Sequence, residues 1–136
     1  LLPNCLGKQT AAEAGAYEAW QVNDDGYITE GTSSNAWIVS ESGKLITRAP
    51  TSEILNGITR LTILEIANEC GVAFAERAFS VDEAKSAREA FTTSATSFVT
   101  PVVQIDDILI GDGAPGVLTR YLIEQYQTYI DALKTL

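Results

Sequence analysis

The segment TEGTSSNAWIV, residues 29–39, combines one acidic side chain, a run of small polar residues and an apolar stretch. The apolar and β-branched residues on either side of the small residues predict strands over 27–29 and 36–40. Glu30 therefore ends a strand, and the residues after it are too small to shield its carboxylate. We expect Glu30 either to point into a cleft or to be a solvated side chain before a loop.

The rest of the chain continues this mixture of short strands and helices. Further strands are predicted over 17–22, 45–48, 72–78, 90–93, 99–105 and 108–110. Helices are predicted over 1–14 and 59–70, after the capping box that begins at Ser80, and from Pro115 onward. Such a pattern predicts one α/β domain over residues 1–136, with a mixed sheet or open barrel flanked by helices.

The composition narrows the classes of protein and of site. The 136 residues carry a net charge of −9 with no basic stripe, which argues against nucleic-acid binding. No apolar run reaches the ~18 residues of a membrane span. A cytoplasmic setting is predicted, with Cys5 and Cys70 as buried free thiols. The sequence has no histidine, which excludes Ser–His and Cys–His nucleophile pairs and histidine metal ligands. We therefore expect no metal site and a cofactor that carries the chemistry of any enzyme built on this chain.

Two segments have the features of anion sites. In LNGITR, residues 55–60, a glycine precedes a helix start, where free N–H groups and the helix dipole favour an anion. The alternative there is simple capping by Thr59. In TTSATS, residues 92–97, small residues between two strands can offer successive N–H groups to a phosphate, unless they form an ordinary polar connection. If both segments bind one phosphate, they face each other across a cavity.

Together with Glu30, these segments resemble the C-terminal half of class IV aminotransferases of the D-amino-acid and branched-chain type, which are fold-type IV enzymes that use pyridoxal 5'-phosphate. Aminodeoxychorismate lyases and (R)-selective amine transaminases are similar in the same regions. The resemblance covers essentially the whole chain. Besides the segments already quoted, it rests on LLPNCLGKQTAAEAGAYEA (1–19), FTTSATSFVTPVVQIDD (91–107) and GDGAPGVLTRYLIEQY (111–126).

At the ring of the cofactor, the resemblance assigns roles to four residues. Glu30 would pair with the pyridine nitrogen, and Leu55 would pack against the ring face. Ser33 and Ser34 would lie near the cofactor's edge. An opposite charge beside the nitrogen keeps it protonated, and a protonated pyridine is the electron sink of pyridoxal chemistry.

At the phosphate, the resemblance assigns the two small-residue segments. Ile58 and Thr59, which follow Gly57, would bind the phosphate through backbone N–H groups and the Thr59 hydroxyl. The other side of the phosphate would be lined by Ser94, Ala95 and Thr96. Some relatives have a threonine in place of Ala95, so this residue could serve only through its N–H group.

The resemblance also implies what this chain lacks. The lysine that carries the cofactor in this family lies a few residues before Leu1, and Lys8 is not at the matching position. Leu1 falls directly into a helical pattern with no capping residue or methionine before it. We therefore expect a C-terminal fragment whose N-terminal domain, with the lysine, is absent.

The implied function of the parent protein, a homodimer, is transfer of an amino group between a D-amino acid and a 2-oxo acid. The alternatives are a branched-chain aminotransferase, a lyase of the aminodeoxychorismate type and an inactive structural remnant.

Overall fold

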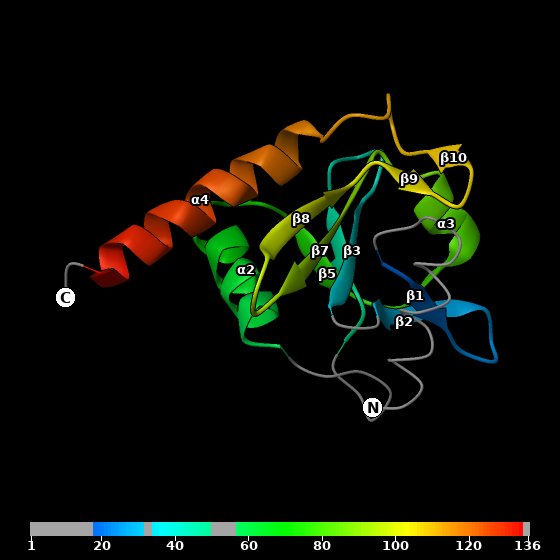
Figure 1. The fold of residues 1–136 in the computed structure, drawn as a ribbon, viewed down its shortest axis with the longest axis horizontal. Coiled ribbons are helices and arrows are strands. Elements are labelled where there is room, and N and C mark those ends of the chain that lie inside the picture. The colour runs from blue at the N-terminus through cyan, green and yellow to red at the C-terminus, as the bar shows by residue number, and fades with distance from the viewer. Residues whose placement is uncertain (1–17, 32–33, 50–56, 135–136) are drawn as a thin grey trace.

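A five-stranded mixed sheet forms the centre of the molecule, as the computed structural model shows for residues 18–31, 34–49 and 57–134 (Figure 1). Its strand order is β5-β4-β3-β7-β8, and only the β4–β5 pair is parallel. The strands are β3 (Asn35–Val39), β4 (Leu45–Thr47), β5 (Phe74–Glu76), β7 (Glu89–Ser94) and β8 (Phe98–Val102). The predicted α/β class with a mixed sheet is confirmed.

Two smaller sheets complete the β structure. An antiparallel sheet of order β1-β2-β6 contains β1 (Trp20–Val22), β2 (Tyr27–Gly31) and β6 (Phe79–Ser80). A hairpin joins β9 (Gln104–Ile105) to β10 (Ile108–Leu109). Every predicted strand is present in the described residues. β1, β4, β5 and β10 are shorter than expected, β2 and β7 are longer, and the strand expected over 99–105 is divided into β8 and β9.

Three helices surround the sheets in the described part of the chain: α2 (Ile58–Glu69), α3 (Val81–Lys85) and α4 (Val117–Lys134). α4 runs along one flank beside α2, and α3 lies at the opposite end of the molecule (Figure 1). The predicted start of the last helix is Pro115, but the helix begins two residues later. The helix predicted over 1–14 lies outside the described residues, as does Cys5.

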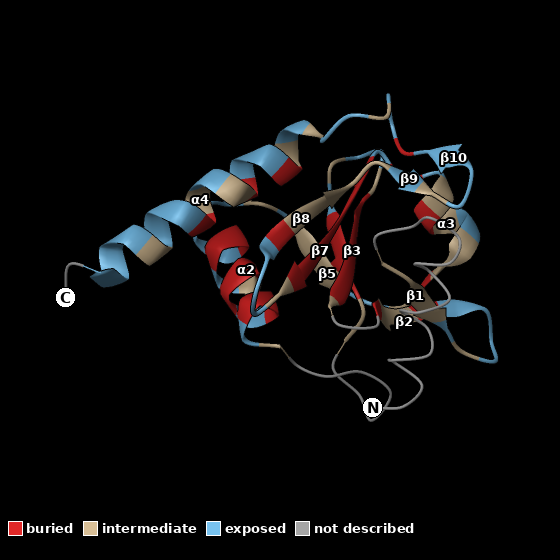
Figure 2. Ribbon diagram, viewed as in Figure 1, coloured by how far each residue is buried: buried red, intermediate tan, exposed pale blue. Residues whose placement is uncertain are grey.

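Strand β3 explains how one sheet supports two cores. All five of its residues are buried, and successive side chains point to opposite faces. Trp37 and Val39 belong to the core under α2 and α4, while Ala36 and Ile38 belong to the core that contains β6 and α3 residues. Trp37 also stacks on Phe91, with ring centroids 5.2 Å apart. Figure 2 shows β3 and β7 as the most continuously buried strands.

The apolar face of α2 is narrower than its sequence pattern indicates. Ile63, Ile66 and Ala67 are buried as expected, but Ile58 is 79% exposed and Leu61 is 46% exposed. The buried residues in the first turn of α2 are polar instead. Apolar periodicity therefore predicts the wrong buried face at this end of the helix. Cys70, which follows α2, is a free thiol as predicted, but it is exposed rather than buried.

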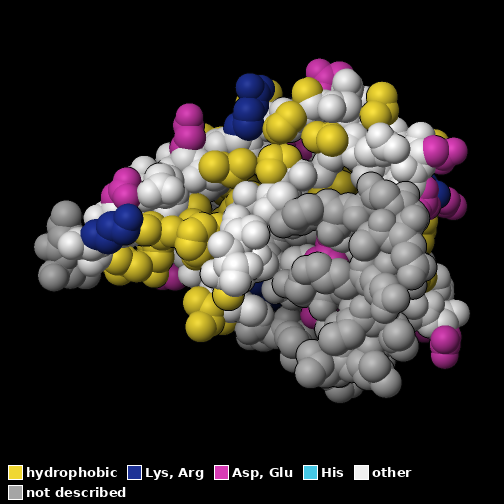
Figure 3. Space-filling view, in the orientation of Figure 1, with side chains coloured by type: hydrophobic (Ala, Val, Ile, Leu, Met, Phe, Trp, Pro, Cys, Tyr) yellow, Lys and Arg dark blue, Asp and Glu magenta, His cyan; other side chains and the backbone are white. Residues whose placement is uncertain are grey.

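Helix α4 also leaves apolar side chains on the surface. Leu122 and Tyr126 are buried, whereas Val117 and Leu133 are more than half exposed. Figure 3 shows one face of the molecule, with apolar side chains gathered along its α4 side.

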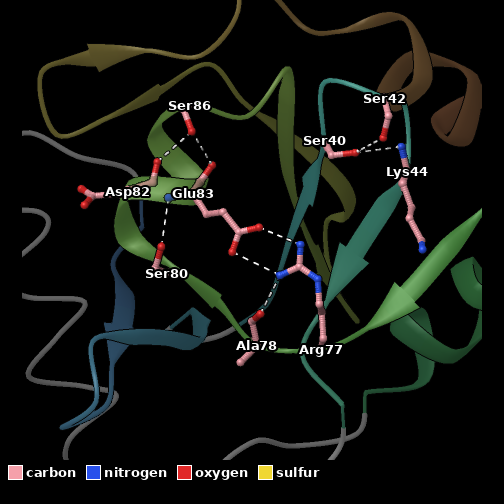
Figure 4. Close-up of polar contacts among 9 residues, drawn as sticks. All are labelled: Ser40, Ser42, Lys44, Arg77, Ala78, Ser80, Asp82, Glu83 and Ser86. Atoms are coloured by element: carbon pink, nitrogen blue, oxygen red, sulfur yellow. Dashed lines mark hydrogen bonds and ion pairs between the residues drawn. The ribbon is translucent and has the colours of Figure 1, made fainter.

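The short helix α3 begins with the expected capping residues, Ser80 and Glu83 (Figure 4). The Ser80 hydroxyl accepts a hydrogen bond from the Glu83 N–H over 3.1 Å. The Glu83 carboxylate accepts hydrogen bonds from both terminal nitrogens of Arg77 at 3.2 Å and 2.7 Å, and a backbone hydrogen bond from Ser80 also lowers the pKa of Glu83. Arg77 and the Ser80 backbone therefore share this carboxylate.

Candidate functional site

The start of α2 has the local features of an anion site. Its N-cap is Gly57, which offers no side-chain cap, and the first turn contains no acidic residue. The N–H groups of Ile58 and Thr59 precede the first backbone hydrogen bond of the helix, from Leu61 N–H to the Gly57 carbonyl at 3.1 Å. Such groups, with the positive end of the helix dipole, favour a bound anion. Capping by Thr59, the alternative from the sequence, is wrong, because Thr59 lies inside the helix.

Thr59 connects α2 to the second small-residue segment. Its side chain is only 4% exposed, and its hydroxyl donates a hydrogen bond to the Ser94 carbonyl over 2.9 Å. Ser94 is the last residue of β7, and the turn after it contains Ala95 and Thr96, both exposed. The Ser94 hydroxyl holds this turn by accepting a hydrogen bond from Ser97 N–H. The two segments that were expected to face each other are therefore adjacent at Thr59 and Ser94.

Asn35 lies where three of these elements meet. It is the first residue of β3, it pairs with Thr93 of β7, and it is 8% exposed. A Cβ atom on Gly57 would lie 2.6 Å from its Oδ1 atom, which is closer than real Cβ contacts. Glycine therefore lets the start of α2 approach the start of β3 this closely, whereas a larger residue would force the Asn35 side chain to shift. Thr93 is held in turn by Trp37, whose Nε1–H donates to the Thr93 hydroxyl over 3.0 Å.

Glu30 lies near the end of β2, as the sequence predicts. It is half-buried, and strand alternation places it on the same face as Ile28, which is 2% exposed. The Gly31 N–H, at the end of this strand, donates to the Ser34 carbonyl over 2.8 Å. Ser34 is therefore next to the strand end that carries Glu30. Ser33 and Leu55, the remaining predicted site residues, lie outside the described residues.

A second carboxylate, which the sequence patterns do not single out, lies beside Ser34. The Ser34 hydroxyl donates to Glu18 Oε2 over 3.0 Å, and the Ala19 N–H donates to the other oxygen. Glu18 precedes β1 and has no local sequence feature that distinguishes it from a surface glutamate. Its role as the partner of Ser34 arises from pairing of β1 with β2, which sequence patterns do not report.

Arg60 is the other residue that the sequence reasoning passed over. Its side chain is fully buried, and it contacts the Glu76 carboxylate. Its position directly after Thr59 in the LNGITR segment was the available signal.

The described residues contain neither a cluster of metal ligands nor a membrane-spanning helix. In that part of the chain, no group of three or more His, Cys, Asp and Glu side chains could hold a metal ion. No helix there is both long enough and apolar enough to cross a membrane.

Comparison with known proteins identifies the family. The sequence model of the amino-transferase class IV family matches residues 1–105. The chain belongs to the class IV aminotransferase family. Over 120 residues it is 46% identical to a D-alanine aminotransferase of Bacillus licheniformis, covering 88% of this chain and 42% of that protein. Over 132 residues it is 40% identical to the D-alanine aminotransferase of Staphylococcus aureus strain N315, covering 97% and 46%.

Solved structures of class IV aminotransferases share the fold. The branched-chain amino acid aminotransferase of Thermobaculum terrenum in its PLP-form superposes with a TM-score of 0.88 at 37% identity, covering 93% of this chain and 41% of that one. The branched-chain amino acid aminotransferase of Escherichia coli gives a TM-score of 0.90 at 31% identity, covering 93% and 42%. The chain thus spans less than half the length of these relatives. The resemblance and fold expected from the sequence are confirmed.

Proposed function

We propose that this chain is the C-terminal half of a pyridoxal-phosphate-dependent aminotransferase. The parent enzyme moves an amino group between a D-amino acid and a 2-oxo acid. The lysine that carries the cofactor lies upstream of Leu1 in an N-terminal domain, and the parent is a cytoplasmic homodimer. The observation that carries the proposal is the hydrogen bond from Thr59 to the Ser94 carbonyl, which joins the two segments that would bind one phosphate.

The phosphate would be bound mainly by backbone N–H groups. Those of Ile58 and Thr59 stand at an uncapped helix start, and a dianion there interacts favourably with the helix dipole. The Thr59 hydroxyl donates to the Ser94 carbonyl and so joins the two segments that would bind the phosphate. On the other side, the exposed turn after Ser94 would contribute the N–H groups of Ala95 and Thr96.

The ring would be oriented by the end of β2. When bound, pyridoxal phosphate supplies an electron sink for bonds broken at the α-carbon of an amino acid. Glu30 would hold a proton on the pyridine nitrogen by charge attraction, which its half-buried position strengthens relative to water. Leu55 would pack against the ring face, and Ser33 and Ser34 would lie at its edge. The contact between Ser34 and Glu18 would fix that edge.

Two observations bear on the substrate. The relatives named above with 46% and 40% identity are D-alanine aminotransferases, which favours a D-amino acid. The solved structures with TM-scores of 0.88 and 0.90 are branched-chain amino acid aminotransferases, which supports that activity as the second candidate. A lyase of the aminodeoxychorismate type would use the same cofactor contacts, and an inactive remnant would retain them without the lysine.

Titration of the ¹⁵N-labelled 136-residue chain with pyridoxal phosphate tests the proposed site. The amide signals of Ile58, Thr59 and Ala95 should shift together and saturate, and pyridoxal, which lacks the phosphate, should bind much more weakly. Amide shifts confined to other parts of the chain would contradict the assignment. Sequencing of the coding region upstream of Leu1 tests the other half of the proposal, because it should reveal a lysine a few codons before Leu1.

A further inference from the structure

Arg60 holds a fully buried positive charge in the first turn of α2. Its side chain is 0% exposed, and its Nη2 atom donates hydrogen bonds to two acceptors. One is the Glu76 carboxylate at 2.7 Å, and the other is the Arg48 carbonyl at 2.9 Å. A guanidinium stays charged at every physiological pH, and a charge buried away from water is costly unless it is paired. These two contacts therefore restrict where the guanidinium can lie.

The two acceptors belong to the ends of neighbouring strands. Glu76 is the last residue of β5 and pairs with Thr47, the last residue of β4, in the parallel pair. Arg48 follows directly, and it is where the chain leaves β4 before it returns at Gly57 to begin α2. Arg60 thus connects the first turn of α2 to the point of departure from β4 and, through Glu76, to β5.

Thr59 and Arg60 anchor the same helical turn in two directions. Consecutive residues of an α-helix point about 100° apart. Thr59 reaches β7 through the Ser94 carbonyl, while Arg60 reaches the β4–β5 edge. The N–H groups of Ile58 and Thr59 lie on this doubly anchored turn. Loss of either anchor should therefore let the helix start move relative to the turn after Ser94.

We infer that Arg60, held by its ion pair with Glu76, is a positioning residue for the phosphate of the cofactor. The inference rests on the proposed function, which assigns the phosphate to the N–H groups of Ile58 and Thr59. Because its side chain is fully buried and its Nη2 atom is directed to Glu76 and Arg48, we assign Arg60 a positioning role rather than that of a phosphate ligand. Its role is to hold the two N–H groups at the correct distance from the Ser94 turn.

Glu76→Gln is the decisive variant. The Glu76 side chain is 36% exposed, so an amide of the same size should be tolerated while the charge that holds Arg60 is removed. Affinities of the 136-residue chain for pyridoxal phosphate and for pyridoxal are measured by the amide titration of Ile58 and Thr59. The variant should bind pyridoxal phosphate at least ~10-fold more weakly, about 1.4 kcal/mol. Its affinity for pyridoxal should stay the same, because only the phosphate contacts depend on the anchor.

Glu83→Gln is the matched control. It makes the same chemical change in the other arginine–carboxylate pair, Arg77–Glu83, whose side chains are 48% and 39% exposed. This variant should retain both affinities. Arg60→Lys keeps the charge and should lose less pyridoxal phosphate affinity than Arg60→Gln. If the Arg60 variants do not fold, Glu76→Gln remains sufficient to decide.

The outcomes separate the inference from the proposed function. If the unmodified chain prefers pyridoxal phosphate to pyridoxal and Glu76→Gln keeps that preference, the positioning role is wrong and the phosphate site stands. Equal loss of both affinities in Glu76→Gln would reveal a purely structural ion pair and would also overturn the inference. If the unmodified chain shows no preference and no shift at Ile58 and Thr59, the phosphate site itself is wrong, and Arg60 has nothing to position.

Discussion

The backbone N–H and the hydroxyl of Thr119 both donate to Oε1 of Glu89, over 2.7 Å and 2.8 Å. The Leu118 N–H donates to the other carboxylate oxygen over 3.1 Å. Glu89 begins β7 and is 4% exposed, so a buried carboxylate from the central sheet caps the start of α4. A Cβ atom on Gly116 would collide with the Glu89 side chain, so glycine is required before the helix. This cap buries the polar Thr119 at the start of α4. Apolar periodicity in the sequence does not predict that a polar residue is buried there.

Replacing Glu89 with glutamine should destabilise the chain. The amide keeps the size of the side chain, but its NH₂ group must face one of the N–H groups that now donate to the carboxylate. Since hydrogen bonds to a charged group contribute about 1.5–3 kcal/mol, we expect the free energy of unfolding to fall by roughly 2 kcal/mol. Urea denaturation measures the change. Glu41→Gln, at an exposed turn residue, is the control and should leave the midpoint unchanged; equal midpoints for both variants would contradict the capping role.

Replacing Thr59 with valine should weaken both the fold and the proposed phosphate site. Valine has the same shape but no hydroxyl, so the Ser94 carbonyl loses the donor that joins it to α2. We expect a loss of about 1–2 kcal/mol in the free energy of unfolding and weaker pyridoxal phosphate binding, while Thr59→Ser retains most of both. Thr128→Val removes a comparable hydroxyl contact, to the Glu124 carbonyl, on the exposed side of α4. Similar losses in the two valine variants would argue against a special role for Thr59.

The Arg77–Glu83 pair should make stability depend on pH in the acidic range. The hydrogen bond from Arg77, helped by its charge, holds the pKa of Glu83 below its ordinary value, although partial burial opposes this. A carboxylate with a lowered folded-state pKa contributes stability above its unfolded pKa, about 4.3, and loses it as pH falls through the folded value. The difference in thermal midpoint between the unmodified chain and Glu83→Gln should therefore be present at pH 7 and disappear at low pH. Because the pair is exposed, the difference should be small and should shrink at high salt. A difference that persists at low pH would exclude this origin.

Sequence patterns predicted the parts of the fold that depend on neighbouring residues. The strand that contains Trp37, the start of α2 after Gly57 and the Ser80 cap all follow from local alternation, turn chemistry or capping. The proximity of Thr59 and Ser94 was predicted only because both segments were expected to bind one phosphate. A ligand hypothesis thus supplied long-range information that periodicity does not contain.

Contacts between distant segments account for what was missed. Glu89 and Thr119 are 30 residues apart, and Arg60 and Glu76 are 16 residues apart. In each case a charged side chain that a sequence pattern assigns to solvent is buried because a partner from another element pairs with it. Charge and hydropathy alone cannot identify such partners, since they are set by which strands become neighbours.

The 136-residue chain alone should have no transaminase activity. The lysine expected to carry the cofactor lies upstream of Leu1, and Lys8 is not at the matching position. Borohydride reduction with excess pyridoxal phosphate, followed by peptide mapping, should give no stoichiometric lysine adduct. A single stoichiometric adduct on Lys8 would overturn the proposed position of the catalytic lysine.

Replacing Glu30 with glutamine in the complete aminotransferase should slow turnover far more than it weakens cofactor binding. Glutamine keeps the size of the side chain but removes the negative charge that would hold a proton on the pyridine nitrogen, and each pKa unit lost there is worth about 1.4 kcal/mol. The phosphate contacts at Ile58 and Thr59 are unchanged, so cofactor affinity should fall only modestly. We expect kcat to fall at least ~100-fold, about 2.7 kcal/mol, while Glu41→Gln, made in parallel, retains full activity. Turnover near that of the unmodified enzyme would show that Glu30 does not face the pyridine nitrogen, and the assignment of the ring site to the end of β2 would then be wrong.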